Sequence, residues 1–250
     1  MQGVHDGLQA LMGRQHIQLS VAQHVRDIEY KRSPRISLIL ITATDVPHEK
    51  KRELHSLMDK ILKIRNSIES IVSLTNLELE TFCSALETKS LIKNEFFLSE
   101  GQVCNFVGFV NFGVLIYFKT TENGDEITTD FAFEGDWVTN NQSRLNNTPS
   151  TINIRAIEDT EIFVIKQQDL NELYLQIPKI ERMGRILTEQ AYLKIVDQTI
   201  ELQVLSAKER YENLLKKHPE IFQKVQLYHI ANYLGIAPKS LSRIRKELFD

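Results

Sequence analysis

The spacing of hydrophobic residues changes twice along this chain of 250 residues. From Met58, apolar residues recur at intervals of three and four, which predicts amphipathic helices over residues 58–88. Within this stretch, Thr75 and Glu78 have the spacing of a capping box, which begins a helix. Over residues 91–165 the interval shortens to two, as is typical of half-buried strands, and the helical interval then returns.

Short β-rich runs alternate with turn signals in the middle of the chain. The runs are Phe96–Leu98, Phe106–Phe118 with a break at Asn111–Gly113, Ile127–Phe133, Ile152–Ala156 and Ile162–Ile165. Between the second and third runs, the Asn-Gly pair at Asn123 and Gly124 predicts a hairpin, because it suits the two positive-φ positions of a type I′ turn. Many short strands at this spacing predict a closed or sandwiched antiparallel β domain.

A long helical pattern follows the predicted strands. A short helix over Gln168–Tyr174 leads to it, and the pattern itself covers Ile180–Val204, with Ile186, Leu193 and Ile200 seven residues apart. A helix of about 25 residues is about 38 Å long, which exceeds what a small domain needs for its own core. We therefore expect this helix to pair with the same helix of a second chain. A helix packed wholly within its own chain is the alternative.

Two short helical patterns flank Gly235 near the end of the chain. Ala231 and Leu234 share one face of the first, and Gly235 ends it as a residue at positive φ would. Pro238 suits the first turn of the second pattern, because that turn tolerates a missing N–H. The residues of the second pattern that face inward are Leu241, Ile244 and Leu248. This arrangement predicts a helix-turn-helix, whose second helix fits a DNA major groove.

Polar and basic side chains share the other face of this second helix. They are Lys239, Ser242, Arg243 and Lys246. The whole chain has a formal net charge of −3, so any contact with nucleic acid must be local. Residues 226–250 carry four basic and two acidic side chains, a net charge of +2 (4 − 2). A basic face that is merely solvated is the alternative to DNA binding.

The first 57 residues show no comparable pattern. They hold one β-like run, Ile36–Thr42, and five of the seven histidines, namely His5, His16, His24, His48 and His55. No two of these histidines have a convincing metal-ligand spacing, so scattered surface histidines are the better interpretation. Because a clean amphipathic pattern begins directly after Met58, we hypothesise that the natural protein starts there. Finding Met1 or Gln2 at the N-terminus of protein made from the native gene would refute this hypothesis.

Several classes of function are excluded or disfavoured by the composition. Two cysteines, Cys83 and Cys104, cannot build a disulfide scaffold or a four-cysteine metal site within one chain, and buried small hydrophobes are the better interpretation. No histidine occurs between His55 and His218, which argues against a histidine-ligated metal site in the β domain. No P-loop, nucleophile elbow or apolar run of membrane-spanning length is present. We expect a cytoplasmic protein that is not an enzyme and needs no metal or cofactor.

The order of a β domain, a long helix and a helix-turn-helix resembles that of the Crp/Fnr family of bacterial transcription regulators, over about residues 68–248. The segments that carry the resemblance are Asn94–Gly101, Phe133–Trp137, Pro149–Thr160 and Leu227–Lys246, and the SLSRIRK sequence resembles a subgroup common in Bacteroidetes. The resemblance implies an α+β protein. Its parts would be an antiparallel β-roll of the cyclic-nucleotide-binding type, a long dimerisation helix and a winged-helix-type helix-turn-helix domain.

We accordingly expect four segments along the chain. They are an N-terminal extension (1–57), a helical lead-in with the β-roll sensor domain (58–178), the dimerisation helix (179–205) and the helix-turn-helix domain (206–250). Ser206 and Glu209 have the spacing of a capping box at the start of the last segment.

The cassette that binds cyclic nucleotides in this family departs from its usual pattern here. The family uses a Gly-Glu pair for the ribose and an Arg followed by Ser or Thr for the cyclic phosphate. In this chain the corresponding positions hold Gly135 with Asp136, and Ser150 with Thr151. Serine cannot replace the bidentate, charge-assisted contact that arginine makes to phosphate, so cyclic AMP is not the expected effector. These four residues and Trp137 form the candidate pocket for an unidentified small-molecule effector.

The resemblance also implies the function and the partners. A homodimer would bind a palindromic operator in double-stranded DNA, with RNA polymerase as a further partner. The family's base-reading positions fall on Pro238, Lys239 and Arg243, of which Arg243 is the first candidate for a guanine contact and Lys239 the second. The candidate phosphate contacts are Ser240, Ser242, Arg245 and Lys246. The alternative is a ligand-sensing module that acts through protein partners rather than DNA.

Overall fold

The computed structural model describes residues 61–249, and their side chains as far as Leu248. The N-terminal segment 1–57, with its β-like run, its histidines and the hypothetical start at Met58, lies outside the described residues.

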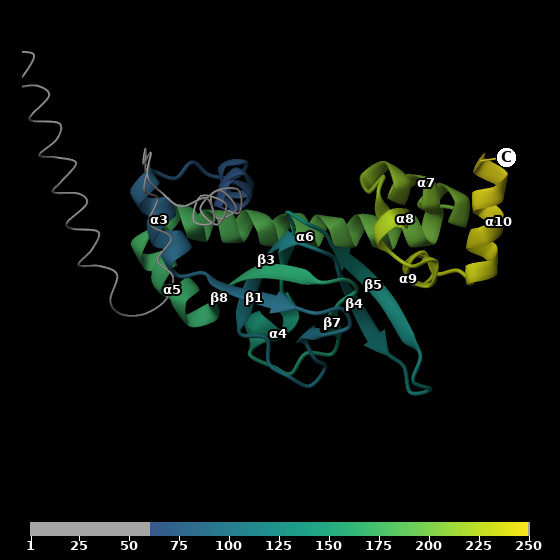
Figure 1. Cartoon of the computed structure of the whole chain (residues 1–250), viewed down its shortest axis with the longest axis horizontal. Coiled ribbons are helices and arrows are strands. Elements are labelled where there is room, and N and C mark those ends of the chain that lie inside the picture. Colours follow the sequence, from purple (N-terminus) through teal and green to yellow (C-terminus); the bar gives the residue numbers. More distant parts are fainter. Residues whose placement is uncertain (1–60, 250) are drawn as a thin grey trace, which may run out of the picture. The chain divides into compact units, whose positions relative to one another are not determined.

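Two four-stranded sheets enclose a common core and form the β-roll (Figure 1). The first has the order β1 (Glu87–Leu91), β8 (Thr160–Lys166), β3 (Phe106–Phe112) and β6 (Trp137–Val138). The second has the order β2 (Phe96–Leu98), β7 (Asn153–Ala156), β4 (Leu115–Thr120) and β5 (Glu126–Ala132). All pairs of strands are antiparallel. The prediction of an antiparallel β-roll is therefore confirmed.

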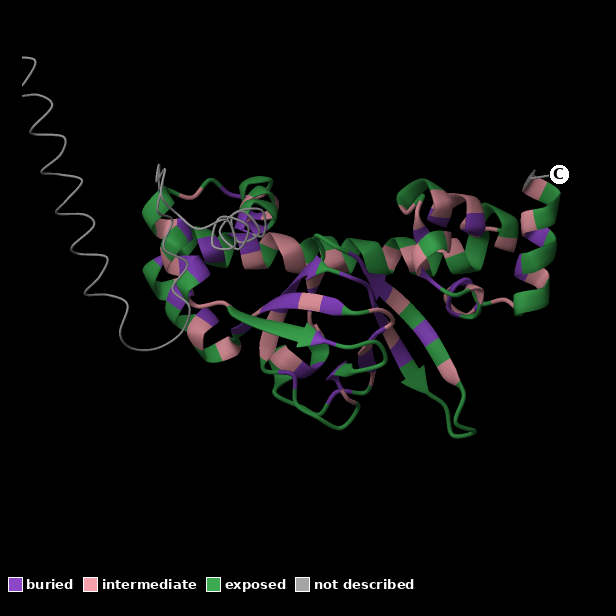
Figure 2. Cartoon of the chain, viewed as in Figure 1, coloured by how far each residue is buried: buried purple, intermediate pink, exposed green. Residues whose placement is uncertain are grey.

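The core of the roll consists of buried side chains that both sheets contribute (Figure 2). Val110 of the first sheet and Ile154 of the second are fully buried in it. Gly108 lies where the packing is closest, because a Cβ atom there would lie 2.8 Å from Cγ2 of Ile162 and 2.9 Å from Cγ1 of Val138. A larger residue at position 108 would therefore push the core apart.

The hairpin between β4 and β5 forms where it was expected, but with a different turn. Its connection is five residues long, and Gly124 alone has positive φ, at 86°. The Gly124 N–H donates to the Thr121 carbonyl at 3.0 Å, and the Thr121 N–H donates to the Asp125 carbonyl at 2.9 Å. The prediction of a type I′ turn was wrong. The strand register leaves five residues to connect, and such loops are most often built around a type I turn, whereas the type I′ turn belongs to two-residue loops.

Helices precede and follow the roll. Residues 61–69 are helical, and α3 (Asn76–Ser84) begins with the predicted capping box, in which the Thr75 hydroxyl accepts from the Glu78 N–H. α4 (Asn141–Asn146) lies between β6 and β7, in a stretch for which the sequence pattern predicted no element. α5 (Gln167–Gln176) follows β8 and packs against the next helix.

The long helix α6 (Pro178–Val204) has 27 residues. Only Ile180 and Met183, in its first two turns, are buried (Figure 2). Several large apolar side chains farther along it are exposed, namely Tyr192, Leu193, Ile195, Ile200, Leu202 and Val204. The described chain therefore does not bury this helix along its length.

Four helices complete the described chain. They are α7 (Ala207–Lys217), α8 (Ile221–Lys224), α9 (Leu227–Tyr233) and α10 (Pro238–Phe249). α7 begins with the predicted capping box, in which Ser206 and Glu209 bond reciprocally. Their buried residues, among them Tyr211, Ile230 and Leu241, join one hydrophobic cluster with Ile116 and Phe131 of the roll.

No strand occurs among residues 206–249, so the wing that the family resemblance implies is not within this part. The segment between α7 and α9 forms the short helix α8 instead, and Ile221 and Val225 of this segment enter the hydrophobic cluster. Among the described helices, none combines the length and the apolar character that crossing a membrane requires.

Candidate nucleic-acid interface and effector cavity

The turn between α9 and α10 is fixed by a glycine in the left-handed conformation. Gly235 has φ 67°, and its N–H donates to the Asn232 carbonyl at 2.9 Å. The Ile236 N–H donates to the Ala231 carbonyl at 3.0 Å. These two bonds define a Schellman motif, which ends α9 and redirects the chain into α10.

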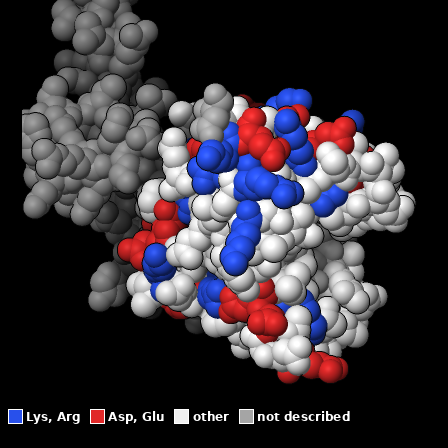
Figure 3. Space-filling view, turned by 90° about the vertical axis from the view of Figure 1, so that its right-hand side faces the viewer, with Lys and Arg blue, Asp and Glu red and all other residues white. Residues whose placement is uncertain are grey.

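α10 has a buried face and an exposed face. Leu241 and Ile244 are buried against the rest of the helical cluster, whereas Lys239, Ser242 and Arg243 are exposed. Lys246 is also exposed. Figure 3 shows Lys and Arg side chains gathered on this end of the protein, with Asp and Glu beside them. The face that the sequence pattern assigned to DNA is thus open to solvent.

The candidate DNA-contacting residues differ in how freely they can reach a ligand. Arg243 is 77% exposed, and its Nε lies 3.8 Å from Oε1 of Glu247, an ion pair too long and too solvated to restrain it. The Ser242 hydroxyl donates to the Pro238 carbonyl at 3.0 Å, and Ser240 is half-buried. Whether these side chains touch DNA stays a prediction.

Arg245 lies apart from the other candidates. It is half-buried, and its guanidinium carbon lies 4.7 Å from the ring centroid of Phe222 on α8. Its Nε is buried without a hydrogen-bond partner. Arg245 therefore packs α10 against α8, and a phosphate contact is not needed to explain its position.

The first helix of the helix-turn-helix also contacts strand β5 of the roll. The Glu126 carbonyl accepts from the Tyr228 hydroxyl at 2.9 Å and from Nδ2 of Asn232 at 2.7 Å. Nδ1 of His229 lies 2.9 Å from the Thr128 hydroxyl, and both residues are buried. Sequence reasoning missed this contact, because it joins residues about a hundred positions apart.

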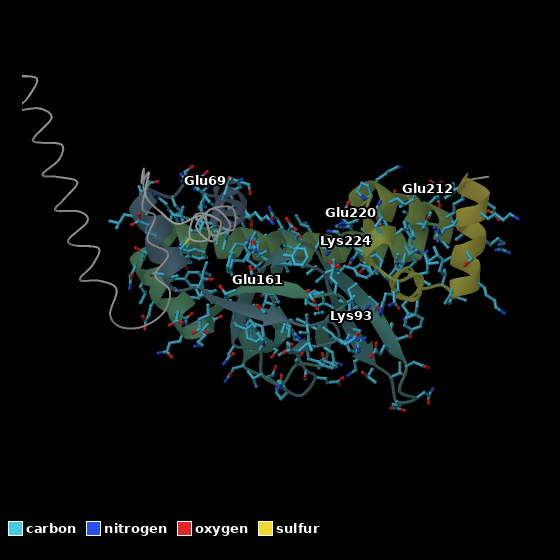
Figure 4. All side chains as sticks on the ribbon, viewed as in Figure 1. Glu69, Lys93, Glu161, Glu212, Glu220 and Lys224 are labelled. Carbon is cyan, nitrogen blue, oxygen red and sulfur yellow. The ribbon has the colours of Figure 1, made fainter. Side chains whose placement is uncertain are left out.

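Two histidines in the α7–α9 region have pKa values below the ordinary value of 6.5. Burial is the main cause for both. The positive charge of Arg155 adds to it at His229, while Glu126 opposes it. The His218 ring stacks on Phe133 with 4.5 Å between the ring centroids. The negative charges of Asp136, Glu220 (labelled in Figure 4) and Asp130 raise the pKa of His218 and so oppose the effect of burial, whereas the positive charge of Lys194 lowers it further.

His229→Gln should flatten the pH dependence of stability. The folded protein favours the neutral ring, so the unfolded chain binds more protons, and the free energy of unfolding falls as pH drops below the ordinary pKa of 6.5. Urea unfolding at about pH 7.5 and about pH 5.5 measures this loss. A smaller loss in His229→Gln is expected, and an equal loss in both proteins would contradict the assignment. His218→Gln serves as the comparison for the second histidine.

A cavity of about 770 Å³ lies between the roll and α6. Roll residues that line it include Tyr117, Phe131, Trp137 and Ile152, and α6 contributes Leu187, Ala191 and Gln198. Nζ of Lys194 on α6 bonds both carboxylate oxygens of Asp130 on β5, at 2.8 and 2.7 Å. This volume suits a small organic molecule.

Three of the five predicted pocket residues line the cavity, namely Gly135, Asp136 and Trp137. Asp136 is open to the cavity, yet the protein around it removes enough water to raise the pKa of its carboxyl group. Its Oδ2 accepts from the Phe133 N–H at 2.8 Å, which lowers that pKa in part. The Asp136 carboxylate is therefore already hydrogen-bonded within its own turn.

The other two predicted residues, Ser150 and Thr151, are not among the residues that line the cavity. Ser150 is buried, and its hydroxyl accepts from Nδ2 of Asn140 at 2.7 Å and donates to the Ile152 carbonyl at 2.6 Å. Thr151 is exposed. Ser150, which stands where the family pattern has arginine, thus uses its hydroxyl for hydrogen bonds within the protein.

The arginines nearby do not take over that position. Arg155 forms a bidentate pair with Glu126 at 2.6 Å and lies 4.6 Å from the Phe118 ring. Arg144 on α4 lines the cavity, but sequence reasoning missed it. It donates to Gln167 at 2.6 Å and to Asn141 at 2.9 Å.

Neither cysteine has the character of a sensor. Both are buried and free, and burial raises the pKa of Cys83 to about 11. Within residues 61–249, no group of three or more His, Cys, Asp and Glu side chains could hold a metal ion.

Known proteins match both the sequence and the fold. Residues 88–176 match the family model of the cyclic nucleotide-binding domain. The transcriptional activator protein Anr of Pseudomonas protegens is 25% identical over 167 residues, which is 62% of this chain and 68% of that protein. The chain is thus similar to the cyclic nucleotide-binding domain over these residues and, over a longer stretch, to a transcriptional activator.

Solved structures show the same fold as this chain. FixK2 from Bradyrhizobium japonicum matches with a TM-score of 0.59 and 19% identity, over 65% of this chain and 84% of that one. A protein from Eubacterium rectale described as a regulator of the Crp/Fnr family matches with a TM-score of 0.54 and 18% identity, over 70% and 83%. At such identities the matches establish the α+β fold of this chain alone.

Proposed function

We propose that this Crp/Fnr-type chain binds a palindromic DNA operator as a homodimer and regulates transcription. The observation that carries this proposal is the exposed basic face of α10, formed by Lys239, Arg243 and Lys246. The Schellman motif at Gly235 and the buried residues Leu241 and Ile244 hold this face outward. Such a helix fits a major groove, where arginine and lysine recognise guanine.

The exposed apolar side chains of α6 support the homodimer. Leu193, Ile200 and Val204 are 59%, 54% and 73% exposed, and they lie at intervals of seven and four on one helix. Apolar residues at such intervals form the seam of a helix pair. Pairing two copies along α6 would bury these side chains and present two α10 helices to the two halves of one operator.

The cavity supports an effector other than a cyclic nucleotide. It has the size of a ligand site and is lined by both the roll and α6, the two parts that a bound molecule would join. The groups that would hold a cyclic phosphate and a ribose are engaged elsewhere, because Ser150 bonds Asn140 and Ile152, and Asp136 bonds Phe133.

Selection of binding sites from a random duplex pool tests the proposed function directly. The experiment uses the purified full chain at a stated salt concentration, because phosphate contacts make affinity strongly salt-dependent. We expect an enriched inverted repeat whose half-sites lie about one helical turn, or about 10 base pairs, apart. No enrichment with or without cell-extract metabolites would overturn the proposal and favour a module that acts on protein partners.

Cyclic AMP should leave the fluorescence of Trp137 unchanged. Trp137 is the single tryptophan of the chain and lines the cavity, so its emission reports on a ligand there. No arginine stands at position 150 to pair with the cyclic phosphate, and neutral Ser150 cannot supply that charge. A titration with cyclic AMP measures this, with Trp137→Phe as the control that assigns the signal. A saturable change with cyclic AMP that 5′-AMP does not produce would contradict the expectation.

A further inference from the structure

The guanidinium of Arg210 on α7 joins the ends of two other helices. Its Nη1 donates to the Leu205 carbonyl at 2.6 Å, and its Nη2 donates to the Leu234 carbonyl at 2.9 Å. Leu205 is the C-cap of α6, and Leu234 is the C-cap of α9, directly before the Gly235 turn. One side chain thus connects the end of the long helix to the turn that leads into α10.

These two carbonyls are suitable partners for a cation. The last carbonyls of a helix have no donor within that helix, and the C-terminal end carries a partial negative charge. A planar guanidinium holds its two terminal nitrogens at a fixed separation, so it can bond both carbonyls at once and fix the angle between them. Lysine carries one charged nitrogen on a flexible stem and cannot impose the same geometry.

The other hydrogen bonds between α6 and the helical cluster are longer or reach one element each. Oε1 of Glu201 accepts from Nδ2 of Asn213 at 3.4 Å and from Nζ of Lys217 at 3.2 Å, and the Lys217 side chain is 55% exposed. Nε2 of Gln198 donates to the Tyr233 hydroxyl at 2.7 Å. Only Leu205 and Ser206 connect α6 to α7 along the chain. The angle between the two helices therefore depends on side-chain contacts such as those of Arg210.

We propose that Arg210 is a positioning residue that sets the direction of each α10 relative to α6, and thereby the spacing of half-sites that the dimer accepts. The proposal rests on the proposed function, since it requires two chains paired along α6. Arg210 touches no base in this scheme. It acts by holding the Leu234 carbonyl, and therefore the start of the turn, against the end of the dimer helix.

Two variants and one matched control test the proposal in the full-length chain. Arg210→Met removes the guanidinium and keeps a long side chain, and Arg210→Lys keeps the charge without the fork. Lys217→Met is the control. It removes another positively charged side chain of α7, which hydrogen-bonds one residue of α6, Glu201. Thermal unfolding shows whether each variant is folded. If Arg210→Met does not fold, Arg210→Lys alone provides the test.

Operators that differ by one base pair between their half-sites provide the first readout. Each added base pair moves a half-site by about 3.4 Å and turns it by about 35°. The wild type and Lys217→Met should prefer one spacing over its neighbours by about tenfold or more, a penalty of the size of one mismatch. Both Arg210 variants should reduce this preference to less than about threefold, with the sequence preference within each half-site unchanged. Unchanged spacing preference, or loss of spacing and sequence preference together, would overturn the proposal.

Distances between the two α10 helices provide a readout that needs no DNA. A spin label at Glu247→Cys reports them by pulsed electron resonance, and the native cysteines are buried. A broader distance distribution in the Arg210 variants supports the proposal, and an unchanged one overturns it. If no operator is enriched but the chain dimerises, the proposed function fails while this measurement still decides the role of Arg210. A chain that does not dimerise overturns both.

Discussion

Replacing Arg243 by alanine should weaken operator binding more than any other single change on α10. A bidentate contact to guanine contributes about 1–3 kcal/mol of discrimination, so two half-sites would lose about 2–6 kcal/mol in a dimer. The side chain is 77% exposed, and its pairing with Glu247 at 3.8 Å costs little to break. Fluorescence anisotropy with the selected operator, and with variants changed at each position, measures both the affinity and the preference. The preference should relax at one position per half-site.

Arg185→Ala is the matched control for this change. Arg185 is also exposed and paired with a glutamate four residues later, but it lies on α6 rather than α10. Lys239→Ala separates a base contact from a phosphate contact. A lysine that touches phosphate alone would weaken binding about equally on all sequences and lower the salt slope by about one. If Arg243→Ala left both affinity and preference unchanged, the guanine assignment would be wrong.

The strands that the sequence predicted well are those that bury several side chains. β2, β3, β4, β5, β7 and β8 each bury two or more residues, and the β-rich apolar runs that supply them are visible in the sequence. β1 was missed because four of its five residues are exposed, and it exists through pairing with β8. α4 was missed for a similar reason. It buries only Ser143 and is held by the Asn140 cap and by Asn147 at φ 52°. The asparagines before and after it were the available signal.

The two candidate sites, the basic face of α10 and the cavity, also differ in how far the sequence could predict them. The exposed basic face of α10 follows from helical spacing alone, because residues three and four apart share a face. The same rule separates Arg245 from Arg243, since residues two apart point in different directions, and the structure places Arg245 against Phe222. The cavity could not be predicted in this manner. Arg144 and Lys194 reach it from elements that meet only in the folded chain.

Placing glutamates at Leu193 and Ile200 should abolish dimerisation and, with it, tight operator binding. Both side chains are more than half exposed in the single chain, so the fold of one chain does not depend on them. Burying an apolar side chain of this size contributes about 1.5–3 kcal/mol, and charges in their place would repel across the seam. The dimer dissociation constant should rise by more than about a hundredfold. Sedimentation equilibrium measures it, and thermal unfolding of the variant shows whether each chain still folds.

Leu175→Glu is the control for the α6 substitutions. Leu175 is 86% exposed and lies on α5, so a glutamate there adds the same charge away from the proposed seam. If the control stays dimeric while the double variant becomes monomeric, α6 is the dimer helix. Half-site contacts would then survive in each monomer, and only the gain from binding two linked half-sites would be lost. A double variant that remained dimeric would place the dimer contact elsewhere. The exposed apolar face of α6 would then need a different partner.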